Sequence, residues 1–248
     1  MSPLETAAPI ELSVVIPAYD EVTRISVTVA RTLEFLARTY PRSEVIVVDD
    51  GSNDDTPLVL AELSRLDPRL VVIRHETNHG KGGAVKSGVL AARGEFVLFM
   101  DADLATPIEE LPKVLAYARA GADVVVGSRA HGTGTEIRKR QPLPRELMGR
   151  TFNVIVRSLL PIDIADTQCG FKLFRRAAAQ AIFARTTLEG FAFDVELLML
   201  AKQLGYEVRD VPVVWSHGPN SKVRMFRDSS KMLLDIWSIR QRFAKTTR

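Results

Sequence analysis

Five apolar residues lead directly into two carboxylates in the stretch Phe96-Val97-Leu98-Phe99-Met100-Asp101-Ala102-Asp103. An uninterrupted apolar run of this length is typical of a strand that is buried on both faces, as in a parallel sheet. Because the run ends abruptly, we expect a central strand whose carboxyl end opens onto an acidic edge.

Working outward in both directions, apolar runs and helical periods alternate along the first half of the chain. We expect strands over residues 12–16, 44–48, 70–74, 96–100 and 123–127, and helices over 22–38, 57–66, 84–92 and 108–120. Pro17 is expected to close the first of these strands. This alternation predicts an α/β fold, with a mostly parallel sheet covered by helices on both faces.

The second half of the chain has a less regular pattern. A Gly-rich, basic loop without clear period follows from Ser128 through Pro144. We expect helices over 145–160, 191–204 and 227–242, a segment 166–174 leading into a further helix, and a strand over 208–215. The chain then divides into a tail (1–10), one domain (11–225) and a basic amphipathic C-terminal helix (226–248).

The composition is that of an ordinary soluble domain. The 248 residues include 33 Lys and Arg against 30 Asp and Glu, for a net charge of +3, and 46% are hydrophobic. The single cysteine, Cys169, cannot form an internal disulfide or a Cys-rich zinc site, which favours a reducing compartment. No apolar run approaches the roughly 18 residues of a membrane span, and residues 1–9 lack the pattern of a signal peptide. We therefore expect a protein that does not span a membrane.

Charge is unevenly distributed despite the small net value. Aspartates gather at residues 49–55 and 101–103, whereas Arg and Lys gather at 138–150 and 222–248. Since functional groups in parallel sheets lie at the carboxyl ends of the strands, the polar segments 17–21, 49–55, 78–83 and 101–103 should meet at one edge. Asp101 and Asp103 are hard oxygen ligands suited to Mg²⁺ or Mn²⁺; the alternative is a solvated turn.

The segment 78–83 (NHGKGG) has the character of a phosphate-binding loop. Glycines permit close approach of the backbone, and a helix beginning near Ala84 would direct its amides at an anion. The segment lacks the glycine that a dinucleotide fingerprint requires, where Val85 stands, and the Ser or Thr of a P-loop, where Gly82 follows Lys81. Nicotinamide and ATP chemistry are therefore disfavoured.

Five segments, in this order, resemble the family 2 glycosyltransferases with a GT-A fold: residues 13–21 (SVVIPAYDE), 48–52 (VDDGS), 78–83 (NHGKGG), 101–103 (DAD) and 127–129 (GSR). Residues 166–174 (DTQCGFKLF), 193–197 (FDVEL), Trp215 and Ser221-Lys222 are similar to the dolichyl-phosphate or polyprenyl-phosphate β-glucosyltransferase branch. The dolichyl-phosphate mannose synthases are related. These enzymes move a sugar from a nucleotide diphosphate to a polyprenyl phosphate.

The resemblance implies roles for individual residues. The nucleotide sugar would be bound by Pro17, Ala18, Tyr19, Glu21, Asp50, Lys81, Asp101, Ala102 and Asp103, with Asp50 at the uracil and a Mg²⁺ or Mn²⁺ ion on Asp101 and Asp103. The acceptor phosphate would be bound by Arg129, Arg145 and Lys222, and the catalytic residues would be Asp103, Arg129 and Arg145.

The sequence also departs from the mannose synthases. Ala105 stands where those enzymes carry a Gln metal ligand, and Gly218 stands where they carry an Arg. Both differences favour the glucosyl branch.

Asp194 and Glu196 have two interpretations. They would either orient sugar hydroxyls or cap a helix and form ion pairs.

The implied reaction follows from the acceptor. A phosphate monoester, with a second pKa of about 6, already carries a nucleophilic oxyanion near neutral pH. We expect direct displacement with inversion at the sugar, with UDP-glucose as donor. GDP-mannose and UDP-N-acetylhexosamine are alternative donors, and a non-catalytic sugar-nucleotide-binding protein is the alternative class. A sugar-1-phosphate nucleotidyltransferase would need a Gly-rich basic signature after the first strand, and residues 17–21 lack it.

The basic C-terminal helix has two interpretations. It either packs on the sheet or lies on an anionic membrane surface. The second interpretation predicts a cytoplasmic enzyme bound peripherally to the cytoplasmic face of a membrane, reaching its lipid alone, through a membrane partner or as a homo-oligomer. We expect no nucleic-acid partner.

Overall fold

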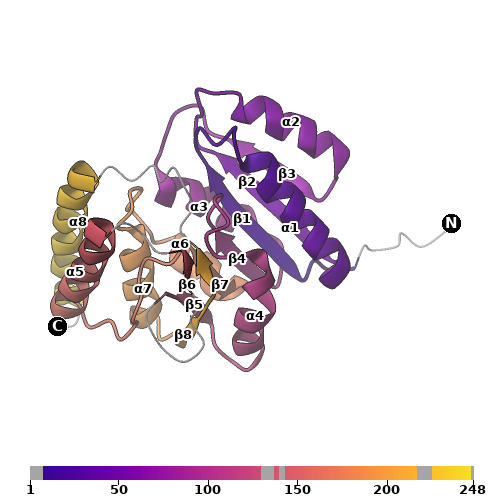
Figure 1. Cartoon of the computed structure of the whole chain (residues 1–248). Helices are drawn as coiled ribbons and strands as arrows, with labels where there is room; N and C mark the ends of the chain where they lie inside the picture. The colour runs from indigo at the N-terminus through magenta and orange to yellow at the C-terminus, as the bar shows by residue number, and fades with distance from the viewer. Residues whose placement is uncertain (1–7, 130–136, 140–142, 217–224, 247–248) are drawn as a thin grey trace.

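The computed structural model describes residues 8–129, 137–139, 143–216 and 225–246 (Figure 1). Within them a seven-stranded sheet has the order β3-β2-β1-β4-β7-β5-β8, and β6 pairs with β9 separately. The strands are β1 (Leu12–Ala18), β2 (Ser43–Asp49), β3 (Leu70–Arg74), β4 (Phe96–Met100), β5 (Val124–Ser128), β6 (Ile137–Lys139), β7 (Phe171–Arg175), β8 (Val208–Pro212) and β9 (Trp215–Ser216). The helices are α1 (Ile25–Thr39), α2 (Thr56–Leu66), α3 (Lys81–Ala91), α4 (Leu111–Arg119), α5 (Leu143–Leu159), α6 (Arg176–Phe183), α7 (Phe193–Gln203) and α8 (Met225–Thr246), with a 3₁₀ turn at Ile108–Glu110.

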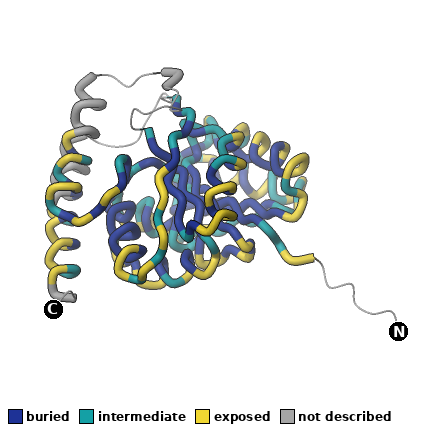
Figure 2. The backbone as a smooth tube through the Cα atoms, turned by 90° about the horizontal axis from the view of Figure 1, so that it is seen from below, coloured by how far each residue is buried: buried dark blue, intermediate teal, exposed yellow. Residues whose placement is uncertain are grey.

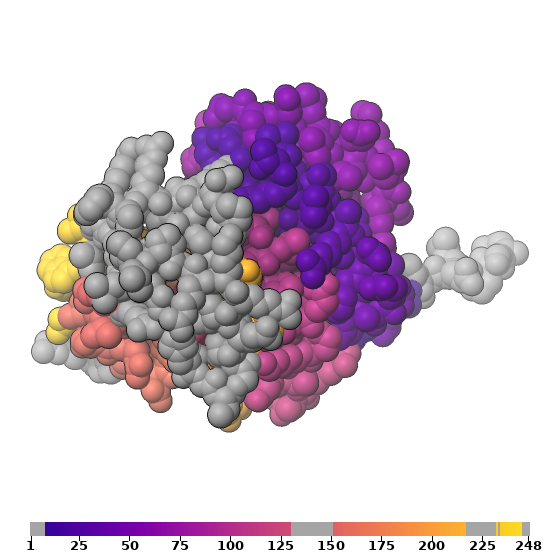
Figure 3. All heavy atoms as spheres, viewed as in Figure 1, coloured from indigo at the N-terminus to yellow at the C-terminus, as the bar shows by residue number. Residues whose placement is uncertain are grey.

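The predicted α/β architecture is confirmed, with helices on both faces of a mostly parallel sheet. Alternate residues of β1 face opposite layers: Val14 and Ile16 pack with α1, α2 and α4, whereas Val15 packs with α3, α6 and α7. The strands are buried between the two helical layers (Figure 2). In the space-filling view, the first half of the chain forms one side of the molecule, and α5 and α8 lie at the other (Figure 3).

Strand β7 is the element that the sequence pattern missed. It lies between β4 and β5 and is antiparallel to both. Residues 166–174 lead into helix α6, as expected, but the sequence pattern assigned no strand to them. In the fold Lys172 is fully buried, since its ammonium meets Asp194 of α7 and the carbonyl of Cys169. A charge at the centre of a strand is tolerated here because a distant segment neutralises it.

Pro17 lies inside β1, where we expected it to end the strand. The Asp50 N–H donates to the Ala18 carbonyl on the β2 side, so the backbone of residue 17 faces the other neighbour, β4. Pairing between β1 and β4 stops at Val15. Because the missing proline N–H falls beyond the end of that ladder, β1 continues through Pro17 without losing a hydrogen bond.

Helix α3 begins at Lys81, earlier than the expected start near Ala84, so Gly82 and Gly83 belong to its first turn. A Cβ on Gly82 would lie 2.6 Å from the Leu188 carbonyl oxygen and 2.8 Å from the Phe193 Cβ. Gly82 therefore serves close packing of α3 against the segment before α7, whereas a Cβ on Gly83 would lie 2.8 Å from the His79 Cβ. Boundaries elsewhere shift by a few residues, and the expected strand 208–215 is divided into β8 and β9.

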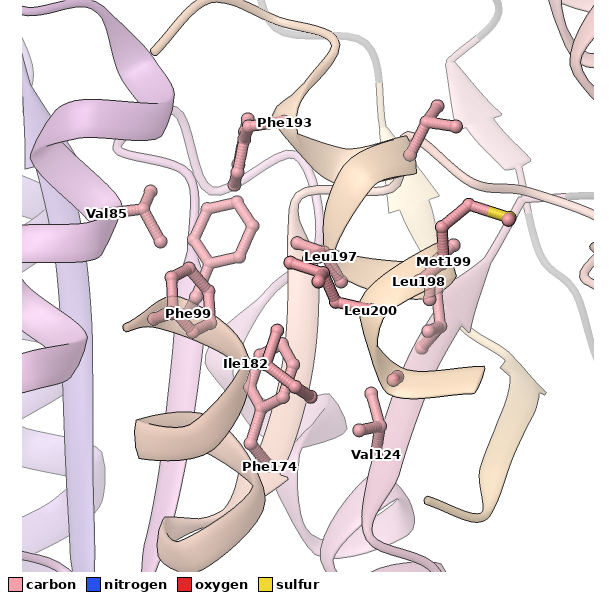
Figure 4. Close-up of a cluster of buried hydrophobic side chains, with 14 of the residues drawn as sticks. Val85, Phe99, Val124, Phe174, Ile182, Phe193, Leu197, Leu198, Met199 and Leu200 are labelled. Carbon is pink, nitrogen blue, oxygen red and sulfur yellow. The ribbon is translucent and has the colours of Figure 1, made fainter. Parts of the chain in front are cut away.

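Aromatic contacts hold α7 and α6 on the sheet. The rings of Phe99 and Phe193 are 5.8 Å apart, and those of Phe174 and Phe183 meet edge to face at 5.4 Å. Figure 4 shows Phe193 at the start of α7 pointing toward Phe99, with Val85 of α3 on the other side. The N-terminal ends of α3 and α7 therefore pack around one ring at the end of β4.

Helix α8 packs against α5 and α7 (Figure 1). Met232, Ile236 and Ile239 face the protein and are buried, whereas Leu234 and Trp237 are 71% and 59% exposed. Packing on the body of the protein therefore accounts for one face of this helix, and a membrane role for its outer face stays a prediction. Among the described residues, no helix combines the length and apolar character needed to cross a bilayer.

The buried pair of Lys172 and Asp194 yields a test of the fold. The Lys172 Nζ lies 2.5 Å from the Asp194 Oδ1. Lys172→Met should lower the free energy of unfolding by about 3–5 kcal/mol, because it leaves a buried carboxylate without its counter-charge. The double variant Lys172→Met with Asp194→Leu should recover most of that loss. Denaturant unfolding measures both.

The control is Arg209→Met, which removes one partner of the exposed pair Arg209–Glu207 and should cost less than about 1 kcal/mol. A loss for Lys172→Met no larger than that of the control would contradict a stabilising role for the buried pair.

Candidate active site

Polar segments from three strands meet at the carboxyl edge of the sheet, as predicted. Residues Ala18 and Asp49 are register partners at the ends of β1 and β2, and Asp101 follows β4, which pairs with β1 on its other side. The turns after β1 and β2 are joined directly: Asp20 N donates to Ser52 Oγ at 2.9 Å, and Asn53 N donates to Asp20 Oδ1 at 2.8 Å. Asn53 Nδ2 also donates to the Tyr19 hydroxyl at 3.3 Å.

Asp101 is held between a glycine and a lysine. Its N–H donates to the Gly170 carbonyl at 3.0 Å, and its Oδ1 lies 2.8 Å from the Lys81 Nζ. A Cβ on Gly170 would lie 2.0 Å from Asp101 Oδ2, so the carboxylate occupies space that only glycine leaves open. Two residues on, Asp103 Oδ1 accepts from Ala105 N at 3.0 Å.

Burial and the charge of Asp101 shift the pKa values of two of its neighbours, Asp103 and Lys81. Burial, and next the negative charge of Asp101, raise the pKa of Asp103 above its ordinary value. Burial lowers the pKa of Lys81, but the charges of Asp101 and Asp194 outweigh that effect and the pKa is raised. Lys81 is therefore a firmly protonated cation beside a carboxylate pair that a further positive charge would stabilise.

Arg24 is a second cation near this pair, and the sequence pattern did not single it out. Its Nη2 donates to the Glu21 Oε1 at 3.0 Å. Burial lowers the pKa of Arg24, but Glu21, and then Asp103 and Asp101, outweigh burial and raise it. In the sequence alone, an arginine at the start of a predicted helix is typical of a solvated helix face. The available signal for another role was Glu21, three positions earlier, a spacing at which the two side chains can pair.

Asp101 and Asp103 fit a divalent cation in donor type. Both supply carboxylate oxygens. Burial, and next the charge of Asp101, raise the pKa of Asp103, and a bound cation would offset both effects by stabilising the ionised carboxylate. Among the described residues, no third His, Cys, Asp or Glu joins them in a metal-binding group. The remaining ligands would therefore come from water and from phosphate oxygens, as is usual for Mg²⁺ at nucleotide sites.

Asp50 organises the loop that precedes α3. Its Oδ1 accepts from the His79 N–H at 2.9 Å and lies 2.7 Å from His75 Nδ1, and its Oδ2 accepts from the Gly80 N–H at 2.8 Å. His75 Nε2 lies 2.9 Å from Ser87 Oγ, so this histidine joins the loop to α3. The anion that these amides bind is thus a carboxylate of the chain itself. These two amides precede α3, so binding of an anion by the start of α3, and a contact of Asp50 with a base, stay predictions.

Arg129, at the end of β5, is paired with Asp166. The Nε and Nη2 atoms donate to the two carboxylate oxygens at 2.6 and 2.8 Å, and the guanidinium lies over the Trp215 ring. Burial alone would raise the pKa of Asp166, but Arg129 lowers it. The structure fixes the position of Arg129 and does not test its role. The side chain of Arg145, in α5, and all of Lys222 lie outside the described residues.

Asp194 and Glu196 are buried in the first turn of α7. Asp194 pairs with Lys172, and Glu196 accepts from the Thr187 and Leu188 N–H groups and pairs with Arg242. The expected ion pairs are therefore present, whereas no side chain among the described residues caps α7, so the helix-capping part of that expectation is wrong. Orientation of a sugar by these residues stays a prediction. Burial raises the pKa of the Cys169 thiol to about 11, as expected of a packed cysteine.

The chain is similar to known proteins over most of its length. The family model described as Glycosyl transferase family 2 matches residues 13–183. A dolichyl-phosphate beta-glucosyltransferase from Dictyostelium discoideum is 35% identical, covering 94% of this chain and 75% of the relative. Proteins of the same name from Saccharomyces cerevisiae and Homo sapiens are 36% and 37% identical, each over 94% of this chain and over 75% and 76% of their own length.

Solved structures agree with the fold. Glucosyl-3-phosphoglycerate synthase from Mycobacterium tuberculosis, crystallised with Mn²⁺, UDP-glucose and phosphoglyceric acid, superposes with a TM-score of 0.71. The two chains are 21% identical, and the match covers 93% of this chain and 80% of that one. The family model matches residues 13–183, and the relatives match 94% of the chain. Together with the alternating α/β order and the carboxylate pair after β4, this shows that the chain belongs to glycosyl transferase family 2 and is a glycosyltransferase.

Proposed function

We propose that this enzyme transfers glucose from UDP-glucose to a polyprenyl phosphate of the dolichyl type, with inversion at the sugar. The observation that carries the proposal is the pair Asp101 and Asp103 beside Lys81, at the sheet edge of a chain that resembles dolichyl-phosphate beta-glucosyltransferases over 94% of its length. GDP-mannose and UDP-N-acetylhexosamine are the alternative donors.

In this proposal Asp101 and Asp103 hold Mg²⁺ or Mn²⁺. The ion would act as a Lewis acid that stabilises negative charge on the departing diphosphate. The Mycobacterium tuberculosis enzyme crystallised with Mn²⁺ and UDP-glucose supports a divalent ion in a chain of this fold. Lys81, already 2.8 Å from Asp101, would contribute a fixed positive charge on the same side.

The acceptor supplies its own nucleophile. A phosphate oxyanion attacks the anomeric carbon, the bond from that carbon to the UDP oxygen breaks, and UDP leaves with the electron pair. No side chain needs to remove a proton, so the task of the protein is positioning. Arg129, Arg145 and Lys222 are the cations proposed to bind the acceptor phosphate.

We place the enzyme peripherally on the cytoplasmic face of a membrane, because a polyprenyl chain resides in a bilayer. Exposed Leu234 and Trp237 on α8, and exposed Val154 on α5, support a surface that contacts lipid. A membrane partner or a homo-oligomer is the alternative means of reaching the acceptor. Vesicle flotation with and without anionic lipid tests this placement.

The donor and acceptor are tested together in one assay. Purified protein with Mn²⁺, radiolabelled UDP-glucose and polyprenyl phosphate should yield an organic-extractable, lipid-linked glucose. Parallel reactions contain GDP-mannose or UDP-N-acetylglucosamine, and transfer from either at a higher rate would replace UDP-glucose as donor. Binding of UDP without transfer from any donor would favour a non-catalytic sugar-nucleotide-binding protein.

Asp103→Asn should lower the transfer rate by about 10²–10³-fold, because charge stabilisation at the leaving group is reduced. The matched control is Asp67→Asn, which alters a carboxylate paired with Arg69 before β3, at the opposite edge of the sheet. The control should retain the wild-type rate. Steady-state rates at saturating substrates compare the two, and a full rate for Asp103→Asn would exclude this residue as a metal ligand.

Removal of divalent ions should abolish transfer. Dialysis against EDTA should reduce the rate to background, and Mn²⁺ or Mg²⁺ added in excess should restore it. The reason is that, without the metal ion, the negative diphosphate would face two negative carboxylates. Calorimetric titration of the protein with UDP, with and without Mn²⁺, measures how far UDP binding itself depends on the metal ion. Undiminished transfer in EDTA would show that Lys81 and Arg24 suffice.

A further inference from the structure

The segment from Thr186 to Gly190 lies directly on the N-terminal turn of α3. Gly82 N donates to the Glu189 carbonyl at 2.7 Å, and the Lys86 ammonium donates to the Thr186 carbonyl at 2.7 Å. A Cβ on Gly80 would lie 2.6 Å from the Glu189 oxygen. The start of α3, which carries Lys81, thus lies between the loop held by Asp50 and this segment.

The position of segment 186–190 depends on Glu196. This carboxylate is fully buried and accepts from Thr187 N at 3.0 Å, Leu188 N at 2.8 Å and Thr187 Oγ1 at 2.8 Å. Two backbone amides and a hydroxyl therefore fix the segment to the first turn of α7. A buried carboxylate with only neutral donors is costly, so its counter-charge matters.

That counter-charge comes from the C-terminal helix. Arg242 Nη2 lies 2.7 Å from Glu196 Oε1, and its Nη1 donates to Thr187 Oγ1 at 2.7 Å. The inward residues Ile236 and Ile239 are buried and hold α8 in place, so Arg242 approaches from a packed helix. The family match ends at residue 183, so Glu196, segment 186–190 and Arg242 all lie beyond it.

We propose that Arg242 is a positioning residue for the donor site. Through Glu196 it holds segment 186–190 against the start of α3, and this keeps Lys81 directed at Asp101. The C-terminal helix thereby completes the donor site from behind, without contacting substrate. The inference rests on the proposed function in one respect, since it takes UDP as the ligand of that site.

The test compares Arg242→Ala with Arg240→Ala, an exposed arginine two positions earlier on the same helix. Arg242→Ala should weaken UDP binding in the presence of Mn²⁺ by about tenfold, measured by calorimetry. It should also accelerate amide hydrogen exchange at residues 80–83 and 186–190. Arg240→Ala should match the wild type in both measurements.

A second variant guards against loss of folding. Arg242→Lys keeps the charge but cannot bridge Glu196 and Thr187 with two nitrogens, so it should show intermediate affinity and exchange. A variant with a lower melting temperature, yet wild-type UDP affinity and wild-type exchange at 80–83, would reduce Arg242 to packing of α8 and overturn the inference. If the wild-type protein binds no UDP, the proposed function fails. The comparison of amide hydrogen exchange at residues 80–83 and 186–190 then still decides whether Arg242 holds segment 186–190 against the start of α3.

Discussion

The buried ion pair between Lys172 and Asp194 is the constraint around which the rest of this structure is arranged. Lys172 stands at the centre of β7, the antiparallel strand between β4 and β5, and Asp194 stands in the first turn of α7. The pair therefore fixes α7 over the middle of the sheet. Phe99 lies between this pair and the sheet edge: the Lys172 and Lys81 ammonium groups are 5.6 and 5.2 Å from its ring centroid. Asp194 contributes to the charge that Lys81 experiences, so the interior pair and the edge pair are electrostatically connected.

The same arrangement explains how an acidic edge is tolerated before any ligand binds. Lys81 pairs with Asp101, Arg24 pairs with Glu21 near Asp103, and Asp50 is satisfied by the amides before α3. Each of these three carboxylates thus has donors from the chain itself. Under the proposed function such a site is preorganised, because the nucleotide and the cation would meet charges that are already held in position.

The sequence predicted the layers of the fold and the edge at which polar residues meet, since strand and helix periods and the carboxyl-end rule are local or topological. It did not predict β7, because a lysine in mid-strand is readable only when its partner is known. Nor did it assign the contacts of Asp50, Glu196 or Arg242, each of which bonds to a segment distant in the chain. The sequence pattern groups Arg242 with a basic tail suited to a membrane, whereas in the fold this side chain reaches Thr187, 55 residues away, and the buried Glu196.

Residue types and their spacing along the chain were therefore enough to give the family, the α/β order and the position of the carboxylate pair Asp101 and Asp103 directly after a central strand. The tertiary structure alone decided which charges are paired and which amides are occupied. The physical reason is that a buried charge is stable only beside a partner, and here the partners come from β7, α7 and α8, which the chain brings to the start of α3 only when it is folded.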